Sequence, residues 1–200
     1  MQQQTQHVKS VLADPTPLGL AGLAMVTLVA SSSKIGFTEG TSLVIPWAIF
    51  LGAFAQLLAG YFDFKHNNLF GAIAFSLYGF FWLGVGSSWM ITHGLLGESM
   101  QASADLEQLG FGFMGYFFLS VILTVASFRT TIFLSIIMVF IDILLLGLTL
   151  DTLGFGGPWH AIAAWSELII SMLSFYGCAA ALLNKMYDCT VLPVGGALIK

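Results

Sequence analysis

Long apolar segments separated by short polar connections run along the whole chain. The hydrocarbon core of a bilayer needs about 20 apolar residues per helix, and segments of that length recur six times. The connections are mostly short, and the longest covers residues 93–108, so no soluble domain fits between the spans. The predicted helices cover residues 17–33, 42–63, 68–92, 109–128, 131–150 and 160–184.

The pattern therefore predicts an all-α polytopic membrane protein whose six transmembrane helices form one bundle. The polar, glutamine-rich start of the chain lacks the basic and then apolar order of a signal peptide. We expect a flexible cytoplasmic tail over residues 1–12, a transmembrane domain over residues 13–189 and a cytoplasmic tail over residues 190–200.

Composition supports a membrane class. Of the 200 residues, 58% are hydrophobic and 8% are charged, and the mean hydropathy is +0.91. A soluble domain carries about 25% charged residues, so the expected surroundings are a lipid bilayer. The few basic residues form no patch for nucleic acid.

Candidate chemistry of the enzymatic kind is missing from the sequence. Cys178 and Cys189 stand apart from any Cys-x-x-Cys or histidine-rich pattern, so we interpret them as free thiols. The histidines are not at metal-ligand spacing, and no serine stands in a nucleophile-elbow motif. We predict a protein that is not an enzyme and that needs no metal and no cofactor.

Orientation follows from the basic residues, which favour the cytoplasmic side of a membrane protein. With both termini inside, Lys34 is the one basic residue of the outer connections. The cytoplasmic side then carries the other five, which are Lys9, Lys65, Arg129, Lys185 and Lys200. We therefore predict that both termini are cytoplasmic.

Two of the predicted spans carry a distinctive face. In the second span the shared face is small and polar, which permits close helix packing in lipid, and Gln56 serves either as a helix–helix link or as a pathway group. That face comprises Gly52, Gln56, Ala59 and Asp63. In the third span an aromatic stripe serves either for packing or as a narrow apolar gate. That stripe comprises Gly71, Phe75, Tyr78, Trp82 and Gly86.

The sixth span carries a small and polar stripe that is able to line a water-filled path. The stripe comprises Glu167, Ser171, Ser174, Cys178 and Ala181. The fifth span has polar residues at seven-residue spacing, hence also on one face. They are Ser135, Asp142 and Thr149.

Asp142 and Glu167 are acids inside apolar segments. An acid at mid-membrane costs about 2.5–3.5 kcal/mol on the insertion scale, and such residues normally mark pathways or proton relays. At about 1.5 Å per residue the two acids reach nearly the same depth of the membrane. One hypothesis is a carboxyl pair that couples transport to protons, with at least one acid protonated at neutral pH. The alternative is two separate protonated acids that form local hydrogen bonds.

Several motifs follow one another in order along the chain. The first span begins with Asp14-Pro15-Thr16-Pro17-Leu18-Gly19-Leu20, the second contains AIFLGAFAQLLAGYFDF and the third contains NNLFGAIAFSLYGFFWL. The chain ends with TVLPVG before its last five residues. In these motifs the chain resembles the acetate uptake transporter family, also called succinate–acetate permeases. The family pattern at the first motif is Asn-Pro-x-Pro-Leu-Gly-Leu, and residues 109–150 match the family only weakly.

The resemblance implies a six-helix bundle that assembles as a homo-hexamer, each protomer with its own path. It implies transport of small carboxylates, acetate first and succinate in some members, together with protons. It also implies that the proline motif lies at the cytoplasmic entrance of the path, and that Leu23, Tyr78 and Leu168 form its constriction.

The chain departs from the family pattern at four positions. Asp14 replaces an asparagine, Leu23 replaces an aromatic residue, and Asp142 and Glu167 stand where neutral residues are expected. These departures concern the substrate and its coupling to protons more than the fold. We expect substrate contacts from the proline motif and from two further polar side chains. The full set is Asp14, Pro15, Thr16, Pro17, Leu18, Gly19, Leu20, Gln56 and Ser171.

The leading functional hypothesis is a proton-coupled carrier, or an anion channel, for acetate and related carboxylates in a prokaryotic inner or plasma membrane. The alternative is a channel for another small solute, neutral or cationic, with Asp142 and Glu167 in the pathway. A third hypothesis, a sensor or structural protein, would need no continuous polar face such as that of the sixth span.

The motif ADPTPLGL also predicts a helix start. Proline is tolerated in the first turn of a helix, where its missing amide would be unpaired anyway. Asp14 is placed to accept a hydrogen bond from a free amide of that turn. An ionised Asp14 would also repel a carboxylate that approaches the same helix end.

Overall fold

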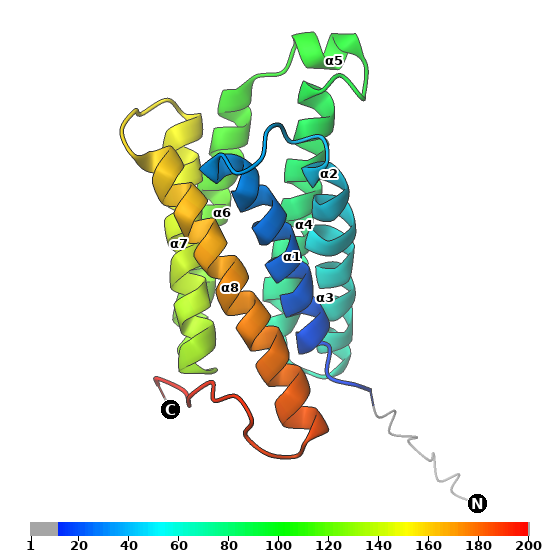
Figure 1. Cartoon of the computed structure of the whole chain (residues 1–200), viewed down its shortest axis with the longest axis vertical. Helices are drawn as coiled ribbons and strands as arrows, with labels where there is room; N and C mark the ends of the chain where they lie inside the picture. The colour runs from blue at the N-terminus through cyan, green and yellow to red at the C-terminus, as the bar shows by residue number, and fades with distance from the viewer. Residues whose placement is uncertain (1–11, 200) are drawn as a thin grey trace, which may run out of the picture.

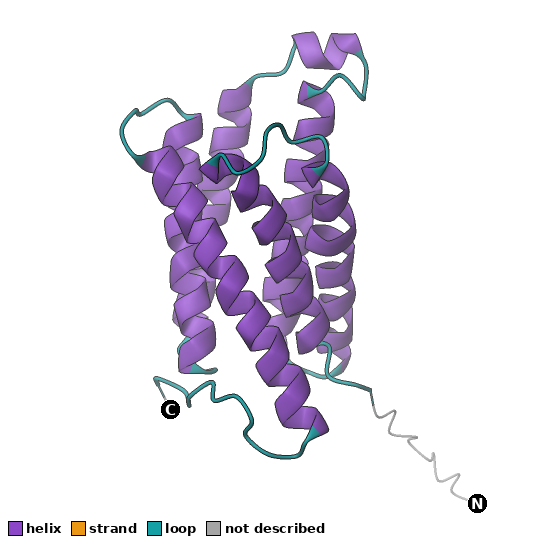
Figure 2. Cartoon of the chain, in the orientation of Figure 1, coloured by secondary structure: helices purple, strands orange, loops and turns teal. Residues whose placement is uncertain are grey.

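Helices account for nearly all regular structure in residues 12–199, which the computed structural model describes (Figure 2). Six helical rods within these residues are long and apolar enough to cross a membrane. They are α1 (Thr16–Ile35), the combined rod Val44–Lys65, α4 (Leu69–Thr92), α6 (Leu106–Ser127), α7 (Ile132–Thr152) and α8 (Trp159–Met186). The predicted all-α fold with six spans is confirmed, and the observed bounds differ from the predicted ones by a few residues.

The rods form a closed ring. α1 packs against α8, α8 against α7, and α7 against α6. On the other side the rod Val44–Lys65 packs against both α1 and α4, and a thin contact between α4 and α6 completes the ring. Figure 1 shows the rods side by side, with the start of α1 and the end of α8 at the same end of the bundle. Large apolar side chains such as Phe50, Phe54 and Phe118 point outward, as in a lipid-facing surface.

Local sequence signals set the helix ends. Oδ1 of Asp14 accepts the amide hydrogen of Thr16 at 2.9 Å, so the acid does serve the first turn of α1. α1 is followed by Gly36, whose φ of +88° is a left-handed conformation that glycine adopts without a steric penalty and that ends the helix. Asp105 and Thr131 accept amide hydrogens at the starts of α6 and α7.

The rod Val44–Lys65 contains a feature that the sequence pattern did not predict. It begins as α2 (Val44–Trp47), continues as a π-helical segment, η1 (Ala48–Ala55), and ends as α3 (Gln56–Lys65). The π-helical stretch lies against small residues of its neighbours, since a Cβ on Gly22 would come within 2.5 Å of the carbonyl oxygen of Leu51. π-helical turns often occur at functional sites.

Two further parts of the chain differ from expectation. The connection 93–108 contains a short helix, α5 (Glu98–Ala102), which lies beyond the ends of the spans (Figure 1). The predicted tail 190–200 is packed on the bundle as far as it is described. Carbonyl oxygens of Val194 and Gly196 accept the amide hydrogens of Phe133 and Ile132 at the start of α7. The predicted tail 1–12 lies outside the described residues except for Leu12.

Candidate functional site: a polar line inside the helix ring

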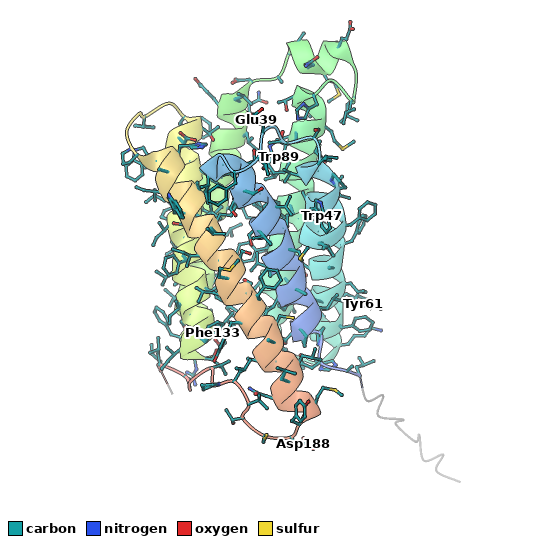
Figure 3. All side chains as sticks on the ribbon, in the orientation of Figure 1. Glu39, Trp47, Tyr61, Trp89, Phe133 and Asp188 are labelled. Atoms are coloured by element: carbon teal, nitrogen blue, oxygen red, sulfur yellow. The ribbon has the colours of Figure 1, made fainter. Side chains whose placement is uncertain are left out.

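A cavity of about 190 Å³ lies inside the ring near one end. Trp82 and Trp89 of α4 and Phe113 of α6 form apolar walls. Lys34 and Glu167 form the polar part of the wall. Figure 3 shows Trp89 near the end of the molecule that carries Glu39, opposite the end that carries Asp188. By the predicted orientation this is the outer end.

An ion pair closes one side of the cavity. Nζ of Lys34, at the end of α1, lies 2.7 Å from Oε2 of Glu167 on α8. The side chain of Glu167 is 1% exposed and that of Lys34 is 19% exposed. A buried pair of this kind loses much solvation, so each partner depends on the other for its charge. The sequence singled out Glu167 but missed Lys34 as its partner.

His160 and Asp151 stand beside the ion pair. Nδ1 of His160 lies 2.9 Å from Oδ2 of Asp151, and Nε2 lies 3.1 Å from the carbonyl oxygen of Lys34. Both side chains also line the cavity. His160 thus joins the ends of α1, α7 and α8 at the rim.

A second polar group lies deeper in the ring, where α4, α6 and α7 meet. The hydroxyl groups of Ser120 and Thr124 both donate to the carboxyl group of Asp142, the latter at 2.7 Å. The hydroxyl of Tyr78 lies 2.9 Å from Oγ of Ser120. Because Ser120 donates its one hydrogen to Asp142, Tyr78 is the donor in this second bond. Sδ of Met138 lies 4.0 Å from the same tyrosine oxygen.

Of the two hypotheses for Asp142 and Glu167, the carboxyl pair is wrong, since each acid forms its hydrogen bonds with other side chains. Within residues 12–199 neither acid hydrogen-bonds to the other, because they face different neighbours. Asp142 lies on the side of α7 that meets α6, whereas Glu167 lies on the side of α8 that meets α1. Equal depth in the membrane therefore does not bring them together.

The polar stripe of α8 is divided between two surroundings: Glu167 lines the cavity, whereas Ser171 and Ser174 lie in the buried contact with α1. Oγ of Ser171 donates to the carbonyl oxygen of Ala24 at 2.8 Å, and both Ser171 and Ser174 are fully buried. The small side chains let the two helices approach closely, as is common in membranes.

Two buried polar atoms near this contact lack a protein partner. Nε2 of Gln56 donates to the carbonyl oxygen of Gly52 at 2.7 Å, but Oε1 of Gln56 has no partner among the described residues. The hydroxyl of Ser174 likewise has no hydrogen-bond partner among the described residues. The bond from Gln56 to Gly52 stays within the rod Val44–Lys65, so it is not the helix–helix link that the sequence offered for Gln56, and the role as a pathway group stays a prediction.

The residues predicted for the constriction divide into two groups. Leu23 and Tyr78 are both buried in the core of the ring, together with Met138. Leu168 is half-buried and is not part of that core cluster, so the structure does not bring it to the other two. Met138 lies against Tyr78 instead. The sequence did not single out Met138, because residues 109–150 match the family pattern only weakly.

The proline motif is held in tight contact at the opposite end of the ring. A Cβ on Gly19 would lie 2.4 Å from the ring of Phe75 on α4. Pro15 and Leu20 are buried as well, while Leu18 is exposed. Pro17 and Thr16 are half-buried in the same turn.

A turn between α3 and α4 lies at this same end. Nδ2 of Asn68 donates to Oδ1 of Asp63 at 3.0 Å, while Oδ2 of Asp63 faces Gly71 and has no hydrogen-bond partner within residues 12–199. No group of three metal-ligating side chains occurs in this described part of the chain.

The ring of six spans with an internal cavity defines a multi-pass membrane protein. A model of the GPR1/FUN34/yaaH family matches residues 1–195. The chain belongs to this family, which is the acetate uptake family that its motifs resemble.

The comparisons also give specific relatives. The chain is 28% identical over 184 residues to the succinate-acetate/proton symporter SatP of Escherichia coli K12, which covers 92% of this chain and 96% of the relative. It is 31% identical over 176 residues to acetate permease A of Emericella nidulans, which covers 76% of this chain and 59% of the relative. It is 29% identical over 181 residues to ammonia transport outward protein 2 of Saccharomyces cerevisiae, with 86% and 62% covered.

A solved structure supports the same assignment. The structure of the bacterial acetate channel SatP superposes with a TM-score of 0.86 at 26% identity and covers 92% of this chain and 100% of that chain. The relatives named here are a symporter, a permease, an ammonia transport protein and a channel. They place this chain among transporters and channels of the multi-pass membrane class.

Proposed function

We propose that this protein transports acetate and related small carboxylates, with succinate as a second candidate substrate, and that protons move with them. The proposal rests chiefly on one observation: a ring of six spans encloses a cavity that is walled by a lysine, and a separate group of buried polar side chains lies within the same ring. The similarity to SatP, a succinate-acetate/proton symporter in one comparison and an acetate channel in the other, supports it.

The path begins at the outer cavity and passes the apolar neck formed by the core around Leu23, Tyr78 and Met138. A carboxylate is heavily penalised in such surroundings unless it is paired, whereas the neutral acid is penalised far less. Gln56, with its free oxygen, and Ser171 lie level with this neck, next to Gly22 and Ala24 of α1, and the start of α1 lies beyond it. The neck offers the phenol of Tyr78 as its hydrogen-bonding group.

Proton coupling is assigned to Asp142 and Glu167, acting separately. Asp142 connects through Ser120 to Tyr78 at the neck. We expect Asp142→Asn to lower proton-driven acetate uptake by about tenfold or more, since a positioned proton-transfer group is lost. Asp188→Asn, on the exposed turn after α8, serves as the matched control. Uptake by the Asp142 variant at the wild-type rate and with the wild-type pH profile would end this assignment.

Uptake of radiolabelled acetate by proteoliposomes, with and without an inwardly directed proton gradient, tests the function itself. We expect uptake that exceeds that of empty vesicles and rises with the gradient. Competition with unlabelled succinate then tests the second substrate. Vesicles that contain the protein but take up no more acetate than empty ones would refute the proposal.

The alternative is a channel for a neutral or cationic small solute. One observation favours it: the outer connections carry Glu39, Glu98, Asp105 and Asp151 against the single Lys34. One relative is named as an ammonia transport protein. Measuring the flux of radiolabelled methylammonium in the same vesicles separates the two, because a carboxylate transporter would leave it at the background level.

The assembly that we propose is a homo-hexamer in the cell membrane of a prokaryote, with both termini cytoplasmic. α6 supports an oligomer, because it has open space at Gly112 and Gly115, where nothing lies within 4 Å of a Cβ. Such small residues allow close helix contacts between protomers. Native mass spectrometry of the detergent-extracted protein measures the number of copies directly, and a monomer would contradict this assembly.

A further inference from the structure

The ion pair in the outer cavity suggests a specific binding role. We propose that Lys34 binds the carboxylate group of the substrate in this cavity, and that Glu167 takes up one proton each time a carboxylate binds. This inference rests on the proposed function, and it identifies the residues that would recognise the substrate and couple it to a proton.

Geometry supports Lys34 as the anion ligand. Its side chain forms part of the cavity wall, and its ammonium group contacts Glu167 at 2.7 Å. An ammonium group has three N–H donors, and Glu167 is its one side-chain partner among residues 12–199. Two donors therefore remain for a ligand within the cavity.

Charge balance explains why a proton must accompany the anion. Lys34 and Glu167 form a neutral unit in nearly buried surroundings, and α4 and α6 add aromatic and aliphatic walls to the cavity. An added carboxylate alone would leave one negative charge uncompensated, which is costly away from water. Protonation of Glu167 removes that excess.

The exchange is balanced in charge and atoms. Before binding, Lys34 pairs with ionised Glu167. A carboxylate and one proton then enter, the carboxylate becomes the partner of Lys34, and the proton resides on Glu167. No bond between heavy atoms forms or breaks, and the net charge of the site stays unchanged.

The remaining titratable groups that face the cavity are Asp151 of α7 and His160 of α8. They are hydrogen-bonded to each other, and His160 also contacts the backbone of Lys34. Because His160 lies beside the ion pair, its contribution is separated from that of Glu167 with a variant of its own. The cavity is about 190 Å³, which is smaller than ligand pockets of about 300–1,000 Å³ and suits a small carboxylate.

Equilibrium binding of radiolabelled acetate to the full chain in nanodiscs, measured between about pH 5 and pH 8, tests the inference. We expect the affinity of the wild type to fall by about tenfold per pH unit once Glu167 is ionised, because one proton is taken up per acetate. Glu167→Gln should remove this slope and raise the affinity at the upper end of the range by about tenfold or more.

Variants of Lys34 provide the second arm. Lys34→Met should abolish acetate binding, and Lys34→Arg should retain it. Lys34→Met alone leaves the buried carboxylate of Glu167 without its partner, which we expect to destabilise the fold. The double variant Lys34→Met/Glu167→Gln avoids this by keeping the site neutral, and it too should bind no acetate. Lys65→Met and Glu39→Gln are the matched controls for loss of one charge, and His160→Gln should leave the pH slope in place.

Two results would overturn the inference. One is acetate binding by the folded double variant at wild-type affinity, and the other is an unchanged pH slope in Glu167→Gln. If either occurs while the wild type takes up acetate in vesicles, the transport function stands and this site assignment alone fails. A wild type that neither binds nor takes up acetate would refute both.

Discussion

Gly19 shows how closely the start of α1 is packed against its neighbour. The ring of Phe75 occupies the space that a Cβ would need, at 2.4 Å. We expect Gly19→Ala to lower the free energy of unfolding by about 1–3 kcal/mol, as other overpacked cores do. Thermal unfolding in detergent measures the change.

Gly84→Ala is the matched control for Gly19→Ala. Gly84 is also helical, on α4, but nothing lies within 4 Å of its missing Cβ. There the substitution should be neutral or stabilising by up to about 1 kcal/mol, because alanine is the better helix former. Equal unfolding temperatures for the two variants would contradict the packing argument.

Asp14 is a second position where one residue carries a testable effect. Its carboxyl group accepts the amide hydrogen of Thr16 at 2.9 Å, and an asparagine oxygen is able to accept the same bond. Asp14→Asn should therefore leave the unfolding temperature unchanged. By removing a negative charge at a helix start, it should strengthen acetate binding at neutral pH.

Isothermal titration with acetate measures the effect of Asp14→Asn. The wild type and the variant are compared at one fixed pH, so that the outer site contributes equally to both. Asp14→Ala provides the comparison, since it removes the charge and also the hydrogen bond, at a cost of about 1 kcal/mol. Weaker acetate binding in Asp14→Asn would mean that Asp14 itself helps to bind the substrate.

At the scale of elements, the apolar pattern was sufficient to predict the six spans. Length and hydropathy are properties of a single segment, and the bilayer imposes them on each segment separately. The π-helical stretch Ala48–Ala55 and the short helix α5 escaped prediction. They depend on local packing and on a connecting segment, for which the apolar pattern has no signal.

The candidate site was predictable only in part for a related reason. Periodicity identified the buried faces that contain Gln56, Tyr78 and Glu167. It gave no information on which neighbouring helix each face meets. Two pairs were therefore missed: Lys34 with Glu167, and Ser120 with Asp142. For the pair of Lys34 and Glu167, the sequence offered one signal: Lys34 is the single lysine among the acids of the outer connections.

The C-terminal segment is another element whose role became evident only in the structure. Oδ1 of Asn184 accepts the amide hydrogens of Val191 at 2.7 Å and Leu192 at 2.8 Å. Its Nδ2 donates to the carbonyl oxygen of Leu192 at 2.7 Å. We expect Asn184→Ala to lower the free energy of unfolding by about 1–3 kcal/mol, because partly buried backbone groups lose their partners.

Limited proteolysis of the detergent-solubilised protein follows the same variant. Cleavage after Lys185 and nearby sites should accelerate in Asn184→Ala relative to the wild type. Gln108→Ala, which changes an exposed residue in the first turn of α6, controls for loss of an amide. Identical cleavage rates in all three proteins would show that the tail is held by other contacts.

For the whole molecule, the orientation in the membrane is the main open prediction. The start of α1, the end of α8, the end of α3 at Lys65 and the turn that carries Arg129 lie at one end of the bundle (Figure 1). Cys189 is exposed at that end, whereas Cys178 is half-buried within α8. A membrane-impermeant maleimide should therefore label Cys189 in inside-out vesicles and not in intact cells.

Cys189→Ser is the control for the labelling experiment. This variant should lose the signal from inside-out vesicles, which assigns the label to one thiol. Labelling of Cys189 in intact cells would place the termini outside and would reverse the assignment of the outer cavity.

The packed C-terminal segment also determines where a reporter can be attached. Its carbonyl oxygens hold the first amides of α7, and the amide of Ile199 bonds to the carbonyl oxygen of Phe128. We expect a fluorescent protein fused directly after residue 200 to weaken these hydrogen bonds, so that its signal would come from a perturbed helix bundle. An insertion at Ser103–Ala104, exposed between α5 and α6, leaves the helix ring intact and suits expression screening better.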